Sequence, residues 1–181
     1  VLRISMTDYP ALLVVPPLQQ ELQRSAPGID LVIQPWHGAD AARAALIDGS
    51  SDLAVSVFPP AEDDLHRQEV MVEHYVVAMR ARHPAAKAFN LKTWLAYPHV
   101  LVSGRGDNRS PLDAELASRH LSRRIGLVVP TFQMVPSLLR GSNMIAMLPS
   151  RVVADFSGLV SFPPPIKAAG FSLHLAWHRR R

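Results

Sequence analysis

The chain has 181 residues, of which 48% are hydrophobic, and it contains no cysteine. This length suits one large domain or two small lobes, and the lack of cysteine excludes disulfides and thiolate metal ligands. The formal net charge is +4, but the arginines are scattered apart from three at the C-terminus. A nucleic-acid footprint is usually a clustered basic stripe, so we expect no direct binding of nucleic acid. Since no run of about 18 apolar residues occurs, we also expect no membrane span.

The first third of the chain alternates between strand-like and helix-like patterns. The predicted elements are a strand at 2–6, a helix at 10–24, a strand at 29–34, a helix at 39–47 and a strand at 52–58. Pro16 and Pro17 conflict with a regular helix, because proline lacks an N–H group and clashes with the preceding turn. The first helix is therefore expected either to begin near Pro16 or to be kinked there. This alternation is typical of a parallel sheet with crossover helices.

A second alternation follows after two further strands. The predicted elements are strands at 69–72 and 75–79, a loop from His83, a helix at 91–95, a strand at 99–102, a helix at 111–120, a strand at 125–129, a helix at 132–139, a strand at 144–148, a helix at 151–156, and strands at 159–162 and 171–177. Two α/β units in succession, with strands left over at the end, predict two lobes joined by crossing strands.

A series of short motifs occurs in order along the chain. They are Arg3–Asp8, Pro16–Leu18, Ala26–Ile29, Asp52–Val55, His83–Ala86, Leu127–Pro130 and Met144–Pro149. In this order they resemble the effector-binding domains of LysR-type bacterial transcription regulators, and most of all the subgroup of nodulation and aromatic-catabolism regulators. The resemblance extends over essentially the whole chain, and it carries more weight than any single motif.

The resemblance implies an α/β fold of the two-lobed, periplasmic-binding-protein-like type 2 class, with two crossing strands. Lobe one would comprise residues 1–77 plus 160–181, and lobe two residues 78–159. Members of the family contact DNA through an N-terminal winged helix-turn-helix, which is absent from this sequence, so any DNA contact would belong to that segment. The resemblance also implies a homodimer or tetramer in the cytoplasm.

Candidate binding residues follow the predicted strands, because ligands of open α/β sheets bind beyond the carboxyl ends of strands. They are Thr7, Asp8, Tyr9, Ser103, Gly104, Thr131 and Phe132. We expect them to bound an effector site in the cleft between the lobes. Thr131 either caps its helix or offers its hydroxyl to a ligand, and Asp8 is either a cap or a buried polar partner. Tyr9, Phe58 and Phe132 could form apolar walls or belong to the core.

Three further features leave alternatives open. The resemblance implies that His99 faces the cleft, whereas a lone histidine is equally compatible with a backbone-bonded structural role. Arg105 and Arg109 could clamp a carboxylate or simply be solvated loop charges. Thr131 stands where aromatic-acid regulators commonly carry histidine. No ligand set for a metal or cofactor is recognisable in the sequence.

The sequence thus predicts an effector-binding regulatory domain that senses a small molecule, with an aromatic or other carboxylate as the first candidate. The alternative is a solute-binding protein of a transport system with the same fold. An enzyme is not expected, because the chain has no nucleophile elbow, zinc-binding helix or phosphate loop.

Overall fold

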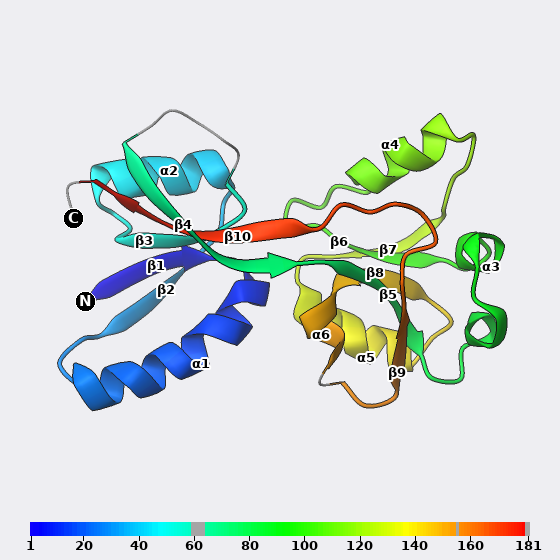
Figure 1. The fold of residues 1–181 in the computed structure, drawn as a ribbon, viewed down its shortest axis with the longest axis horizontal. Coiled ribbons are helices and arrows are strands. Elements are labelled where there is room, and N and C mark those ends of the chain that lie inside the picture. The colour runs from blue at the N-terminus through cyan, green and yellow to red at the C-terminus, as the bar shows by residue number, and fades with distance from the viewer. Residues whose placement is uncertain (59–63, 155, 180–181) are drawn as a thin grey trace. The chain divides into compact units, whose positions relative to one another are not determined.

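In a computed structural model, which describes residues 1–58, 64–154 and 156–179, the strands form two separate five-stranded sheets. Each sheet belongs to its own unit (Figure 1). Unit 1 comprises Val1–Glu73 and Phe171–Arg181, and unit 2 comprises His74–Gly170. The chain therefore passes from unit 1 to unit 2 and back, as the fold class predicts.

The unit boundaries differ from those expected from the sequence, which were after residue 77 and before residue 160. Strands β5 (Tyr75–Arg80) and β9 (Leu159–Phe162) pair with each other in antiparallel register from Val77↔Phe162 to Arg80↔Leu159. This pairing holds both strands in the sheet of unit 2, so the divisions fall outside the strands, at residues 73/74 and 170/171.

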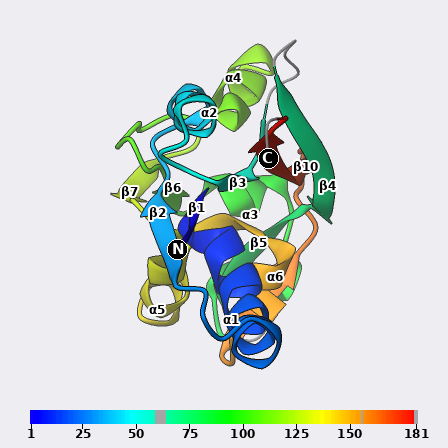
Figure 2. The same cartoon turned by 90° about the vertical axis from the view of Figure 1, so that its left-hand side faces the viewer.

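Unit 1 follows the predicted alternation. Its elements are β1 (Leu2–Met6), α1 (Asp8–Ser25), β2 (Leu31–Pro35), α2 (Ala39–Asp48), β3 (Leu53–Ser56), β4 (Leu65–Glu73) and β10 (Phe171–His178). The sheet order is β2-β1-β3-β10-β4. Strand β1 pairs in parallel with both β2 and β3, while β10 runs antiparallel between β3 and β4. Figure 2 shows β2 and β4 at opposite edges of this sheet.

Helix α1 begins at Asp8 and contains both prolines, so a start near Pro16, one of the two alternatives expected, is wrong. Proline inside a helix removes a hydrogen bond and costs about 3 kcal/mol. Burial of an apolar stripe offsets this cost. Val14, Val15 and Leu18 pack against a cluster that contains Ile4 and Met6 of β1. Helix α2 lies on the other side of the sheet (Figure 1) and packs on Ala54.

Unit 2 repeats the same plan. Its remaining elements are the 3-10 helix η1 (Pro84–Ala88), α3 (Leu91–Leu95), β6 (His99–Val102), α4 (Pro111–Ser118), β7 (Ile125–Val129), the 3-10 helix η2 (Phe132–Met134), α5 (Val135–Arg140), β8 (Ile145–Pro149) and α6 (Ser150–Ala154). The sheet order is β7-β6-β8-β5-β9. Strand β6 pairs in parallel with β7 and β8, and β5 is antiparallel to β8.

Three predicted segments of unit 2 differ in detail. Residues 84–88 form a 3-10 helix rather than a loop, because the His83 side chain accepts a hydrogen bond from the Ala85 N–H at 3.0 Å. The helix predicted at 132–139 begins as a 3-10 turn. The helix predicted at 151–156 is observed as Ser150–Ala154, and residue 155 lies outside the described residues.

The core of unit 2 gathers on the side of the sheet that α3 and α4 cover. Trp94 and Leu116, both fully buried, contact a cluster that contains Val77, Met79 and Ile145 from the strands. Helix α5 lies on the opposite side of this sheet (Figure 1). No helix among the described residues has both the length and the apolarity needed to span a membrane.

Gly126 of β7 gives a test of this packing. A Cβ atom there would lie 2.7 Å from Met144 Cε and 2.8 Å from Pro98 Cβ, and the rigid proline ring cannot move aside. We therefore expect Gly126→Ala to destabilise the chain by about 1–3 kcal/mol in urea unfolding. Gly28→Ala is the control, because nothing lies within 4 Å of its Cβ position. Equal stability of the two variants would contradict this account.

Candidate functional site

In unit 2 the candidate residues lie together at the carboxyl edge of the sheet. Val102 and Val129 are the last paired residues of β6 and β7. Beyond them, the Ser103 N–H donates to the Val129 carbonyl at 2.9 Å. A Cβ at Gly104 would lie 4.0 Å from the Pro130 carbonyl oxygen. Ser103, Gly104 and the residues after Pro130 therefore share one edge, as parallel pairing requires.

Thr131 occupies the position before η2 but makes no side-chain capping bond. The capping role, one of the two expected for it, is therefore not observed. The residue is half-buried, and the described residues offer its hydroxyl no hydrogen-bond partner. The Ser103 hydroxyl, by contrast, already takes part in a hydrogen bond, because its Oγ accepts from the Asp107 N–H at 3.0 Å. Its hydroxyl proton can still be donated.

In unit 1, Thr7 follows β1 and precedes helix α1. Its carbonyl accepts from the Ala11 N–H at 3.2 Å, but its side chain makes no capping hydrogen bond. Asp8, in the first turn of α1, is half-buried and carries the charge that suits the positive end of the helix dipole. Both units thus place a threonine just past a strand with its hydroxyl not used for capping.

Tyr9 lies inside unit 1 rather than at its surface. The residue is 3% exposed, and its hydroxyl donates to the carboxylate of Glu73. The Phe171 ring meets it edge-on, with centroids 6.4 Å apart. Tyr9 therefore does not present an exposed apolar wall, and Phe58 is likewise buried, against Trp36. Sequence reasoning missed Glu73, which no local motif marks.

His99 is separated from the other candidates of unit 2. It is the first residue of β6, whereas Ser103 follows the last, so the two are about 13 Å apart along the strand. His99 is fully buried. Its Nε2 lies 2.9 Å from the carbonyl oxygen of Trp94, whose ring meets it edge-on. Of the two roles that the sequence left open, His99 therefore has the structural, backbone-bonded one. It does not lie with the candidate residues at the carboxyl ends of the strands.

The environment of His99 favours the neutral imidazole. Burial lowers the pKa of His99 from 6.5 to about 4, although the hydrogen bond to Trp94 raises it and the nearby Arg123 charge lowers it further. Because a carbonyl accepts at Nε2, this nitrogen carries the proton. The buried Nδ1 has no hydrogen-bond partner among the described residues, as expected for an unprotonated nitrogen in an apolar core.

A buried ion pair that sequence reasoning missed lies near His99. The Nε of Arg123 donates to Asp113 Oδ1 at 2.8 Å, and Nη2 donates to Oδ2 at 3.0 Å. Ser110 donates to the same carboxylate through its N–H at 2.7 Å and its hydroxyl at 3.0 Å. Burial would raise the pKa of Asp113, but the bonds and charge of Arg123 and the Ser110 bonds outweigh it and lower the pKa to about 2.

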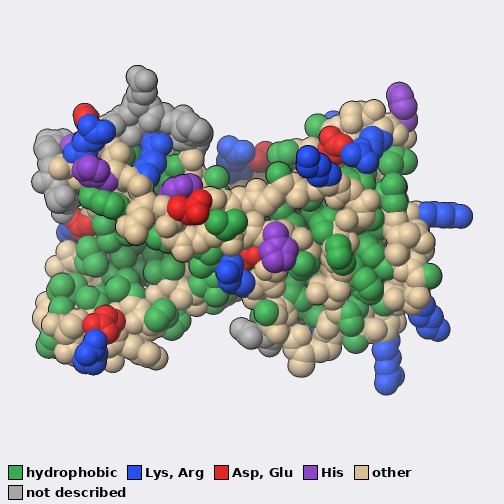
Figure 3. Space-filling view, viewed as in Figure 1, with side chains coloured by type: hydrophobic (Ala, Val, Ile, Leu, Met, Phe, Trp, Pro, Cys, Tyr) green, Lys and Arg blue, Asp and Glu red, His purple; other side chains and the backbone are tan. Residues whose placement is uncertain are grey.

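The loop arginines differ in their surroundings. Arg105 is 87% exposed and pairs with Asp107 at 3.3 Å, which is an ordinary solvated ion pair. Arg109 is also exposed. On the face drawn in Figure 3, lysine and arginine side chains are scattered and form no stripe. Within the described part of the chain, no three His, Asp or Glu side chains form a metal-binding group.

Comparison with known proteins agrees with this architecture. The LysR substrate binding domain family matches residues 1–181. The transcriptional activator NagR of a Ralstonia species is 28% identical over 98% of the chain, and the chain spans 60% of the length of NagR. The regulatory domain of MexT, a transcriptional activator in Pseudomonas aeruginosa, is 27% identical with a TM-score of 0.81, and the match covers 99% of this chain and 88% of that one.

A more distant structure shares the fold alone. It is the effector-binding domain of QuiR in complex with shikimate, at 18% identity and a TM-score of 0.73, with 99% of this chain and 88% of that one covered. The fold and the strand-end edges thus define a two-lobed, periplasmic-binding-protein-like domain. The chain belongs to the LysR substrate-binding domain family. NagR and MexT, which it resembles, are named as transcriptional activators.

The neutral state of His99 gives a prediction about pH. The folded pKa of about 4 lies below the ordinary value of 6.5, so the unfolded chain binds the extra proton between these values. The stabilisation is complete above about pH 6.5 and is lost as the pH falls toward 4. At about pH 5 the parent chain should have lost about 2 kcal/mol relative to about pH 7.5 through this residue.

The test is urea unfolding of the parent and of His99→Gln at both pH values. Glutamine can donate to the Trp94 carbonyl but does not titrate, so the variant should lose less stability on acidification. The other histidines are common to both chains and cancel in the comparison. An identical loss in both proteins would contradict the role assigned to His99.

Proposed function

We propose that this chain is the sensory part of a longer DNA-binding transcription regulator, which acts in the cytoplasm and changes its DNA-bound state when a small molecule binds. DNA contact would lie in a winged helix-turn-helix outside this sequence. The chain itself would carry out no catalysis, hold no cofactor and bind no nucleic acid. Membership of the family and the named roles of NagR and MexT as transcriptional activators support this proposal.

We propose further that the effector contacts the carboxyl ends of the strands in each unit. Thr7 and Asp8 would contribute from unit 1, and Ser103, Gly104, Thr131 and Phe132 from unit 2. The observation that carries the proposal is that Thr7 and Thr131 both follow a parallel strand without using their hydroxyls as caps. Hydroxyl groups at such ends suit a ligand with polar substituents. The buried Tyr9 would support Thr7 from within unit 1 rather than touch the ligand.

The ligand class proposed is a small carboxylate with an aromatic or other apolar body. The acidic group would bind among the hydroxyl and N–H donors of Ser103, Gly104 and Thr131, because the charge of Asp8 would repel it. The half-buried ring of Phe132 would supply apolar contact. In the QuiR domain the bound molecule is shikimate, which is a hydroxylated carboxylate and fits a site rich in hydroxyl donors.

We also propose a two-fold dimer in which α1 of each copy contacts the other copy, as a reciprocal interface requires. Apolar side chains are exposed on this side of the sheet: Leu12 of α1 is 43% exposed, and Ile33 of β2, which shares the α1 face of the sheet with Leu31, is 37% exposed. Exposed apolar side chains on one surface are typical of protein interfaces.

Thr131→Val tests the proposed effector contact. The substitution keeps the shape of the side chain and removes its hydroxyl, so a bound effector should lose about 1 kcal/mol of affinity, and somewhat more if the hydroxyl donates to a carboxylate. A thermal-shift screen of aromatic and aliphatic carboxylates first identifies a ligand, and calorimetry then compares parent and variant. Arg179→Ala is the control and should bind normally. Undiminished affinity of a folded Thr131→Val would refute this contact.

Leu12→Glu tests the proposed dimer. A charge on the exposed surface of α1 cannot be desolvated cheaply at an apolar interface, so the variant should sediment as a monomer at concentrations where the parent is dimeric. Urea unfolding should show that each chain stays folded, because the side chain at position 12 is exposed enough to keep a carboxylate in contact with water. A parent chain that is monomeric at high micromolar concentration would exclude the dimer.

A further inference from the structure

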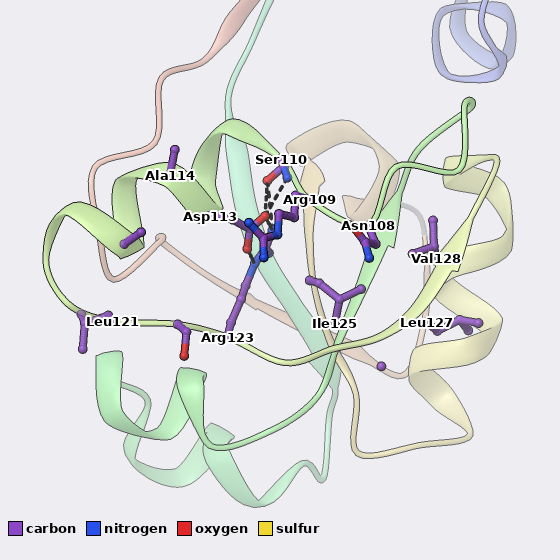
Figure 4. Close-up of a pocket in the computed structure, with 13 residues that line it drawn as sticks. Asn108, Arg109, Ser110, Asp113, Ala114, Leu121, Arg123, Ile125, Leu127 and Val128 are labelled. Carbon is purple, nitrogen blue, oxygen red and sulfur yellow. Dashed lines mark hydrogen bonds and ion pairs between the residues drawn. The ribbon is translucent and has the colours of Figure 1, made fainter.

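A cavity of about 710 Å³ lies wholly within unit 2, between helix α4 and the edge strand β7 (Figure 4). Its wall includes residues of the 108–110 loop, of α4, of the segment after α4, and four consecutive residues of β7, 125–128. None of the strand-end residues proposed above lines it. The volume is within the range of small-molecule sites.

One end of the cavity is formed by the buried network of Ser110, Asp113 and Arg123. Figure 4 shows the guanidinium end of Arg123 directed toward the other two side chains. The Arg123 side chain is only 2% exposed. Its hydrogen bonds run through Nε and Nη2, and no bond from Nη1 to another described residue is found. A nearly buried guanidinium in the cavity wall therefore keeps donors for a ligand.

Arg109 adds a second cation to the wall. Unlike Arg105, which pairs with Asp107, Arg109 has no ion pair or side-chain hydrogen bond with any described residue. Two arginines and one aspartate are the charged residues that line the cavity, and the aspartate is already neutralised by Arg123. The local charge is therefore positive and favours an anion.

The rest of the wall is largely apolar. Leu121, Ile125 and Leu127 contribute side chains, and the small side chains of Ala114 and Ala117 on α4 leave space between the helix and the strand. An apolar wall beside a pair of cations suits a molecule that has an anionic group at one end and an apolar body at the other. It does not suit a fully hydrated inorganic anion, which would leave the apolar side chains without contact.

We propose that this cavity is a second ligand site, for a carboxylate attached to a small aromatic or acyl body. The carboxylate would accept hydrogen bonds from Arg109 and from Nη1 of Arg123, and the apolar body would lie against Ile125 and Leu127. The bidentate geometry that guanidinium groups offer to carboxylates makes arginine the appropriate residue. The site is complete within unit 2 and does not depend on the strand-end site.

Benzoate and benzamide are suitable probes, because they share size and shape but differ in charge. Titration of the isotope-labelled chain with benzoate, followed by two-dimensional NMR, should shift the amide signals of Ala117, Gly126 and Leu127. Benzamide at the same concentrations should shift them far less. Shifts of equal size with both probes, or benzoate shifts confined to residues 103–104 and 131–132, would overturn the proposal.

Two variants test the contacts. Arg109→Gln should raise the Kd of benzoate at these signals about tenfold or more, since a hydrogen bond to a charged group is lost. Arg105→Gln is the matched control, a neighbouring exposed arginine outside the cavity wall, and should leave the Kd unchanged. Equal weakening by both substitutions would mean that only the general charge of the loop matters, and the site would be refuted.

Ala117→Leu tests the cavity itself by filling it. The variant should abolish the benzoate-induced shifts while urea unfolding and the unaffected amide signals show a folded chain. Thr131→Val should leave these shifts intact, so the second site and the strand-end site succeed or fail separately. Retained binding in a folded Ala117→Leu would show that benzoate lies elsewhere.

Discussion

Parallel strand pairing is the constraint on which the rest of this structure depends. In both units the first of the three parallel strands lies between the second and the third, in the orders β2-β1-β3 and β7-β6-β8. Parallel strands need crossover connections, which place helices on the faces of the sheet and all carboxyl ends at one edge. Thr7, Ser103 and Thr131 lie at such edges for this reason.

The same constraint divides the polar residues by the end of the strand that they occupy. His99, at the amino end of β6, lies in the core, and there burial keeps it neutral. Asp113 and Arg123 remain ionised in the same region because two hydrogen bonds join them, and a buried charge without such a partner would be costly. Polar groups in this core are thus tolerated when they are neutral or paired. The threonine hydroxyls that make no capping hydrogen bond lie instead at the carboxyl edges of the sheets.

Local patterns predicted the parts of the fold that depend on neighbouring residues. The strand at Leu2–Met6 and the strand at His99–Val102 were predicted to the residue, because short apolar runs between turn residues mark buried strands. Long-range pairing explains most of the differences. Strand β4 begins at Leu65 rather than Glu69, since β10 pairs with it along its whole length. Helix α1 continues through both prolines rather than beginning near Pro16, which was one of the two alternatives expected, because tertiary burial outweighs the cost of the prolines.

The candidate site was predicted less well, since strand ends can be read from sequence but the surroundings of a side chain cannot. Tyr9 and His99 have the right residue types, yet Glu73 and Trp94, from distant or separate elements, occupy their polar atoms. The candidate residues that remain at the strand ends offer hydroxyl and backbone groups, and none of these residues is a cation. The cavity between α4 and β7, in contrast, has two guanidinium groups. Hydroxyl groups discriminate between ligands through the direction of their hydrogen bonds, whereas guanidinium groups attract any anionic ligand through their charge. The strand ends are therefore better suited to select a particular molecule, and the cavity to accept a class of acids.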